Sequence, residues 1–160
     1  MKNIFTIVSV LALGLLISFS CKKSTTTTTT KTTGSTTTVN TNTTTTNLSV
    51  DAVDIAGMGA TGNSNNAGEY QLYGSAATGY PNVNITFANT APSGTYNISS
   101  SAAPASGYCY FNYFSNITNS SSASSGVVTV VSGSPRTAIF TNVVCSGSAG
   151  THTLTGAFKF

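Results

Sequence analysis

The clearest structural signal lies at the C-terminal end of the sequence, in Thr151-His152-Thr153-Leu154-Thr155-Gly156-Ala157-Phe158-Lys159-Phe160. Threonines and a lysine alternate there with a mostly apolar set, and such a period of two is typical of a β-strand with one buried face. The buried face would carry His152, Leu154, Phe158 and Phe160, with Gly156 at a bulge or a point of close packing. The stretch therefore predicts a last strand that is paired into a sheet.

The same period recurs upstream, from residue 48 onward. Val83 to Phe87 alternates cleanly, and Val127 to Val131 is apolar on both faces, which indicates a central strand. Further strands are predicted at 70–72, 96–98, 108–114 and 139–145, separated by turns rich in Gly and Pro. No apolar stripe of helical period is present. We therefore expect residues 48–160 to form an all-β domain, a single antiparallel β-sandwich or barrel of about seven to nine short strands.

Charge is scarce and unevenly placed. Only 6% of the 160 residues are charged, and the formal net charge is +3. Four lysines lie in the first 31 residues, whereas from Leu48 onward two basic residues against three carboxylates give −1 (Arg136 and Lys159 against Asp51, Asp54 and Glu69). The basic pI thus belongs to the N-terminal segment, and no nucleic-acid partner is expected.

The N-terminus has the features of a secretion signal. Lys2 precedes an apolar run from Ile4 to Phe19, which as a helix would span roughly 24 Å, short of the hydrocarbon core. The run leads into Ile17-Ser18-Phe19-Ser20-Cys21, which resembles a bacterial lipoprotein signal, although Ser18 stands where that signal prefers Leu. We expect a signal peptide at 1–20 and lipidation of Cys21, which would attach the chain to a membrane. The alternative is an ordinary signal peptide cut after Ser20.

A threonine-rich segment follows Cys21. Residues 24–47 contain 16 Thr among 24 residues, with no aromatic side chain and one charge, Lys31. With no apolar partner face, this segment buries too little surface to offset the entropy of ordering it. We expect 21–47 to be a disordered or extended tether.

Cys109 and Cys145 remain once Cys21 is assigned to the lipid. Both lie in predicted strands, in a compartment where disulfides persist. A Cys109–Cys145 disulfide forms only if the two strands come close together. The alternative is two buried free thiols.

Tyr108 to Phe114 is the most aromatic stretch, with five aromatic residues among seven. The strand period places Tyr108, Tyr110 and Phe114 on one face, opposite Phe111 and Tyr113. One interpretation is that one set fills the core and the other packs under a loop. The other is an exposed platform for sugar rings or a partner strand, formed by Tyr108, Tyr110 and Phe114.

Motifs for catalysis are weak. Gly57-Met58-Gly59-Ala60-Thr61-Gly62 matches a dinucleotide fingerprint, but a helix-poor loop follows, and no acidic residue occurs beyond Glu69. His152 is the only histidine, and Asp51 with Asp54 is a thin donor set for Ca²⁺. We expect no enzyme activity, no cofactor and no metal.

Several short motifs are shared with a known group. The Cys21-Lys22-Lys23 start, the Thr-rich spacer, Gly94-Thr95-Tyr96, the 125–130 strand and the terminal 154–160 strand resemble small uncharacterised outer-membrane lipoproteins of Gram-negative bacteria. The resemblance implies an all-β domain and assigns no catalytic residue. Surface-exposed members often have acidic residues after the lipidated Cys, where this chain has Lys22 and Lys23. The periplasmic face and the cell surface of the outer membrane both remain open.

These observations predict a lipid-anchored cell-envelope lipoprotein with a non-catalytic structural or interaction domain. The alternative is a surface carbohydrate-binding or adhesin-type module that uses residues 108–114. The expected partners are the membrane, through the lipid, and a glycan or an envelope protein.

Overall fold

The computed structural model describes residues 27–32, 35–40, 45–65 and 67–160. In these residues every regular element is a β-strand, so the expected all-β class is confirmed. None of the described elements is a helix of the length and hydropathy needed to cross a membrane. The strands are β1 (Thr27–Thr32), β2 (Ser35–Asn40), β3 (Asn47–Val50), β4 (Val53–Ile55), β5 (Gly59–Ser64), β6 (Tyr70–Ser75), β7 (Asn82–Phe87), β8 (Gly94–Ser99), β9 (Tyr108–Phe114), β10 (Ser120–Ala123), β11 (Val127–Val131), β12 (Thr137–Gly147) and β13 (Gly150–Lys159).

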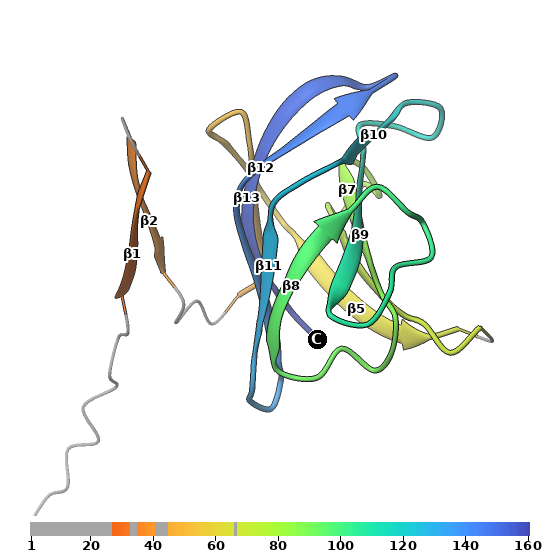
Figure 1. Cartoon of the computed structure of the whole chain (residues 1–160). Helices are drawn as coiled ribbons and strands as arrows, with labels where there is room; N and C mark the ends of the chain where they lie inside the picture. Colours follow the sequence, from red (N-terminus) through yellow and green to blue (C-terminus); the bar gives the residue numbers. More distant parts are fainter. Residues whose placement is uncertain (1–26, 33–34, 41–44, 66) are drawn as a thin grey trace, which may run out of the picture.

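Eleven strands form one large sheet in the order β4-β3-β13-β12-β11-β8-β9-β7-β6-β5, with β10 paired to both β12 and β9 (Figure 1). The predicted count of seven to nine strands is therefore too low. The extra strands lack the apolar alternation that revealed the others, since β5 reads Gly-Ala-Thr-Gly-Asn-Ser and β10 reads Ser-Ser-Ser-Ala. The sheet is also not wholly antiparallel, because β8 and β9 run parallel.

The strands predicted from alternation are present. Residues 151–160 correspond to β13, and residues 83–87 to β7, each to within one residue. β11 is a central strand as expected, between β12 and β8. The prediction that both of its faces are buried is wrong, because Val127 and Val131 are 43% and 42% exposed. The outer face of the sheet is open at β11, so only Val128 and Val130 reach the core.

The sheet is curved, so that strands far apart in its order share one core (Figure 1). The rings of Phe111 on β9 and Phe140 on β12 pack edge to face, 5.0 Å apart, and Phe158 on β13 lies 5.1 Å from Phe140. On β6, Gly74 lies so close to the Phe158 ring that a Cβ would overlap it. These contacts hold β13 against β6, near the other end of the strand order.

Arg136 contacts Phe160 through both its backbone and its side chain. Its backbone exchanges two 3.0 Å hydrogen bonds with Phe160, and its guanidinium lies 4.6 Å from the Phe160 ring and 5.3 Å from the Tyr70 ring. The same guanidinium donates to the carbonyls of Thr90 and Ala91 at 2.8 and 2.6 Å. This one cation therefore joins the terminal residue, β6 and the 88–93 loop.

Two of the described strands lie within the Thr-rich segment. β1 and β2 pair with each other as an antiparallel two-stranded sheet, separate from the large one. The domain also begins slightly before residue 48, because Thr46 Oγ1 accepts a hydrogen bond from the Lys159 amide and Asn47 Oδ1 accepts one from Ala157. The predicted signal peptide at 1–20 and the lipidation site Cys21 lie outside the described residues.

Candidate functional site

The aromatic strand β9 separates its side chains as the alternation predicts. Cys109, Phe111 and Tyr113 are buried in the core, so the inward set is aromatic. Tyr108, Tyr110 and Phe114 point to the outer face of the sheet, where Tyr108 is 44% exposed and the other two are half-buried. The three predicted platform residues thus share one outer surface.

The strand register extends this surface over two neighbouring strands. Directly paired residues point to the same side, so the outward side chains of β7 and β6 continue the row begun on β9. We call this surface the aromatic–amide face. It consists of Gln71, Tyr73 and Ser75 on β6, Asn82, Asn84 and Thr86 on β7, and Tyr108, Tyr110, Asn112 and Phe114 on β9. Thr86 points to this side but is buried, at 3% exposed. The sequence alone did not reveal the contribution of β6 and β7, since it does not show which strands are neighbours.

Cys109 and Cys145 are buried free thiols in the structure, as in the alternative to the predicted disulfide. Strand β10 lies between the two strands that carry them, because it pairs with residues 112–114 of β9 on one side and with residues 145–147 of β12 on the other. Two strand spacings are about 10 Å, beyond the roughly 7 Å between Cα atoms that a disulfide tolerates. Burial raises the pKa of each thiol to about 12, which makes both thiols poor nucleophiles.

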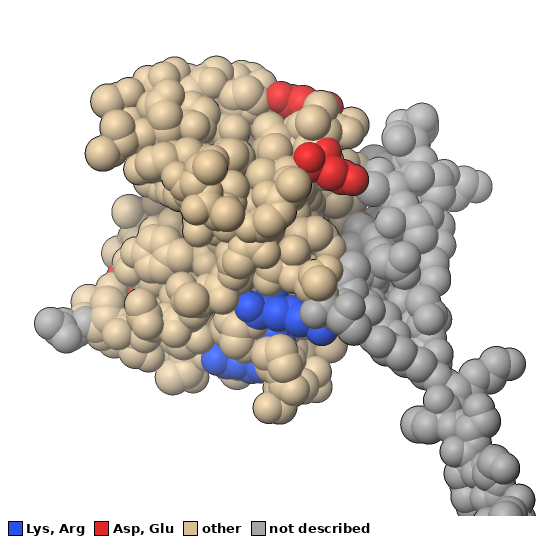
Figure 2. Space-filling view, turned by 180° about the vertical axis from the view of Figure 1, so that it is seen from behind, with Lys and Arg blue, Asp and Glu red and all other residues tan. Residues whose placement is uncertain are grey.

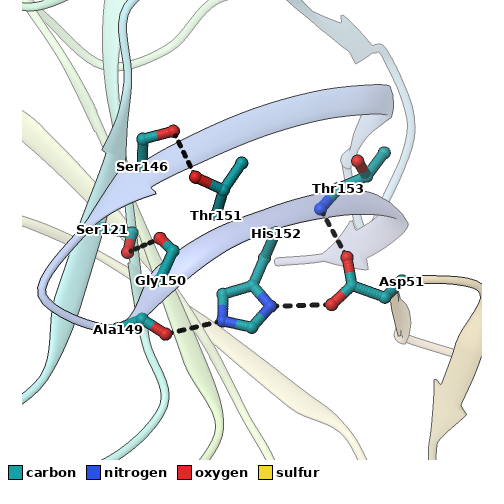
Figure 3. Close-up of polar contacts among 8 residues, drawn as sticks. All are labelled: Asp51, Ser121, Ser146, Ala149, Gly150, Thr151, His152 and Thr153. Carbon is teal, nitrogen blue, oxygen red and sulfur yellow. Dashed lines mark hydrogen bonds and ion pairs between the residues drawn. The ribbon is translucent and has the colours of Figure 1, made fainter.

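His152 and Asp51 form a close polar pair at the surface of the described domain (Figure 3). His152 Nδ1 lies 2.7 Å from Asp51 Oδ2, and His152 Nε2 lies 2.8 Å from the carbonyl oxygen of Ala149. Asp51 also accepts a 2.8 Å hydrogen bond from the Thr153 amide. The imidazole thus contacts one carboxylate and one backbone carbonyl, and the carboxylate partner was not predicted from the sequence.

A tight turn brings Asp51 to this position. Asp51 and Ala52 connect β3 to β4, and both have a positive φ, 51° and 65°. Two such residues are characteristic of a two-residue type I′ hairpin. The Asp51 amide also donates to Thr153 across the β3–β13 pairing, at 2.9 Å. The hairpin therefore aligns the carboxylate with the beginning of β13.

Both ring nitrogens of His152 face acceptors. A neutral imidazole has one N–H, so it can serve only one of the two contacts, whereas an imidazolium serves both. The hydrogen bond to Asp51 is the main reason why the pKa of His152 is raised, followed by the one to Ala149. An imidazole held in this way has no lone pair directed at a nucleophile, and the pair is best understood as a structural clasp.

Cys145 pairs directly with His152 across β12 and β13, a juxtaposition that sequence analysis missed. The signal was present, since the two residues are symmetric about the turn between the two strands. A Cys-His-Asp triad is nevertheless not formed, because the imidazole nitrogens contact Asp51 and Ala149 and the thiol is fully buried. Tyr113 packs against the other side of the ring, at 5.1 Å between centroids.

The clasp makes the stability of the domain depend on pH. Since the pKa of His152 is raised, its contribution is complete below the ordinary value of 6.5 and is lost as the pH rises through the raised pKa. Since the pKa of Asp51 is lowered, mainly by His152, its contribution is present above 3.8 and is lost as the pH falls through the lowered pKa. We expect His152→Gln to lower the melting temperature more at pH 5.5 than at pH 9.

The effect should be small, because the side chains of His152 and Asp51 are 23% and 51% exposed. Thermal melts of both proteins at the two pH values measure it. Asp54→Asn, which changes another exposed carboxylate near the same hairpin, serves as the control and should show no such difference. If His152→Gln lowered the melting temperature equally at pH 5.5 and pH 9, the ion pair between His152 and Asp51 would be contradicted.

In the part of the chain that the structure describes, no group of three or more His, Cys, Asp or Glu side chains is placed to hold a metal ion. Comparisons with known proteins find no matching family model, no similar curated protein and no similar solved structure. The chemistry of the site residues is therefore the basis for assigning a function.

Proposed function

We propose that this chain is a lipid-anchored protein of the outer membrane whose β domain acts by binding, as a structural or interaction module. The main support for the lipid anchor is the position of Cys21, which follows the apolar run 4–19 and has the small residues Ser18 and Ser20 just before it. The segment between Cys21 and β3 would then hold the domain away from the membrane, at the periplasmic face or at the cell surface. The resemblance to small outer-membrane lipoproteins supports the same assignment.

The site chemistry favours binding over catalysis. Both nitrogens of His152 are engaged by Asp51 and Ala149, and burial raises the pKa of both core thiols far above neutrality. Neither His152 nor the two core thiols are thus poised to act on a substrate. We assign no catalytic residue, cofactor or metal.

In this proposal the curved sheet closes on itself as a sandwich or a barrel. Its support is the contact of Phe158 on β13 with Gly74 on β6, together with the 5.6 Å ring pair of Tyr70 and Phe160. Such a closed core presents outward side chains on a firm surface, which suits recognition by a rigid face.

A carbohydrate-binding or adhesin-type module at the cell surface is the second candidate. The observation that favours it is the aromatic–amide face, which presents Tyr73, Tyr108, Tyr110 and Phe114 together with amide side chains. Aromatic rings with polar neighbours are suited to flat ligands that have both apolar and hydroxylated sides.

The anchor is tested by metabolic labelling with a fatty acid. Thioether formation needs the Cys21 thiol, so Cys21→Ser should abolish the label and leave uncleaved precursor or a soluble product. Cys109→Ser serves as the matched control, because that thiol is buried in the core. Equal label in the wild type and in Cys21→Ser would contradict the proposal.

A further inference from the structure

The aromatic–amide face offers a long row of rings along β9. Tyr108, Tyr110 and Phe114 occupy alternate outward positions of one strand, and the six steps from the first to the last cover roughly 20 Å. Tyr73, 39% exposed, adds a ring two strands away. A row of this length matches several units of a polymer better than it matches a single small molecule.

The face carries no charged side chain. Every one of its members is aromatic, an amide, Ser or Thr, and Figure 2 shows how few charged groups the domain presents on the side it displays. A charged ligand would give up its hydration here without an ion pair in return. The complementary ligand is uncharged, with hydroxyl groups for the amides and apolar faces for the rings.

Asn84 marks the place on this face where a hydrogen bond is missing. Its Oδ1 is shielded from solvent and has no partner among the described residues. Unsatisfied buried acceptors are uncommon in folded proteins. Its register neighbours are Tyr73 and Asn112, and the Tyr73 hydroxyl is engaged elsewhere, by Gln71 Oε1 at 2.6 Å. A ligand hydroxyl reaches this atom only if the side chains that shield it move, because Asn84 Oδ1 is not accessible to solvent.

We propose that the aromatic–amide face binds an uncharged polysaccharide, with the chain lying along β9 and its hydroxyls directed to the amides of β7. This assignment rests on the second candidate function and gives it a ligand class and an extended set of residues. Tyr108 and Phe114 stack on the sugar rings.

Co-sedimentation of the full chain, purified in detergent, with insoluble cellulose and chitin tests the proposal, and the polyanion alginate, coupled to beads, is the charged comparison. The wild type should bind at least one uncharged polymer and not alginate. Tyr108→Ala and Tyr73→Ala should each weaken binding about tenfold, as truncation of an aromatic contact commonly does. Tyr108→Phe, which keeps the ring, should stay within about threefold of the wild type.

Two exposed valines on the outer face elsewhere provide matched controls. Val131→Ala on β11 and Val144→Ala on β12 remove exposed apolar groups outside the aromatic–amide face and should leave binding unchanged. Thermal melts of all variants verify folding, and because Tyr108 and Tyr73 lie on different strands, each tests the face independently.

Failure of the wild type to bind any uncharged polymer would overturn the inference, as would equal binding to alginate or undiminished binding by both alanine variants. The fatty-acid label separates this failure from that of the anchor. If the chain carries the fatty-acid label but binds no polysaccharide, the proposed envelope function stands and only the ligand assignment is contradicted.

Discussion

Deleting residues 156–160 is expected to unfold the β domain. Phe158 is fully buried, and it packs on Phe140 and on Gly74 from the other end of the strand order. Loss of a buried Phe side chain costs about 3–5 kcal/mol, while whole domains are stable by only 5–15 kcal/mol. The deletion also removes Phe160, and with it both backbone hydrogen bonds to Arg136 and the ring beside its guanidinium.

Thermal melts of the truncated and parent chains measure this effect. The matched control is deletion of 27–40, which removes β1 and β2, because these strands pair only with each other in the described sheets. That control should melt close to the parent. A C-terminal truncation that melts within a few degrees of the parent would mean that β13 does not close the core.

Gly74→Val should produce the second large loss of stability. Gly74 is buried on β6, and any Cβ there overlaps the ring of Phe158. The Phe158 ring cannot move away easily, because it also packs against Phe140, at 5.1 Å between ring centroids, in a closely packed core. Overpacking at such sites typically costs 1–3 kcal/mol and sometimes more, and we expect about 3 kcal/mol in urea unfolding.

Gly59→Val is the matched control for this substitution. Gly59 also lies in a strand, β5, but nothing lies within 4 Å of the position of its Cβ. Its effect should stay below about 1 kcal/mol. Combining Gly74→Val with Phe158→Leu should recover part of the loss, because the smaller side chain makes room. Equal stability of the two glycine variants would contradict the Gly74–Phe158 contact.

Much of the fold was predictable from local alternation. β7 and β13 have one apolar and one mostly polar side, so their period of two identifies the strand and most of its inward residues. β9 is aromatic on both sides, so its alternation separated two sets of residues without showing which set faces the core. β5 and β10 contain small and polar residues and become strands through pairing with their neighbours, which no local pattern reveals. The same limit explains β11, whose outward valines are exposed because no second layer covers them there.

The site was only partly predictable, for a related reason. Alternation assigned Tyr108, Tyr110 and Phe114 to one face, but the strand order that adds Tyr73 and Asn84 depends on long-range pairing. Asp51 reaches His152 through a turn with Ala52 at a positive φ, where Gly or Asn is the usual signature. β10, itself not predicted, lies between β9 and β12, the strands that carry Cys109 and Cys145.

The central claim is that the chain is held at a membrane by a lipid on Cys21 and presents its β domain for binding. The most direct measurement is the mass of the N-terminal peptide of the mature chain, isolated from the membrane fraction of the producing bacterium. The account predicts a peptide that begins at Cys21 and carries the added mass of diacylglycerol and any further acyl chain. A mature chain that begins at Cys21 with an unmodified thiol, or that retains residues 1–20, would contradict it.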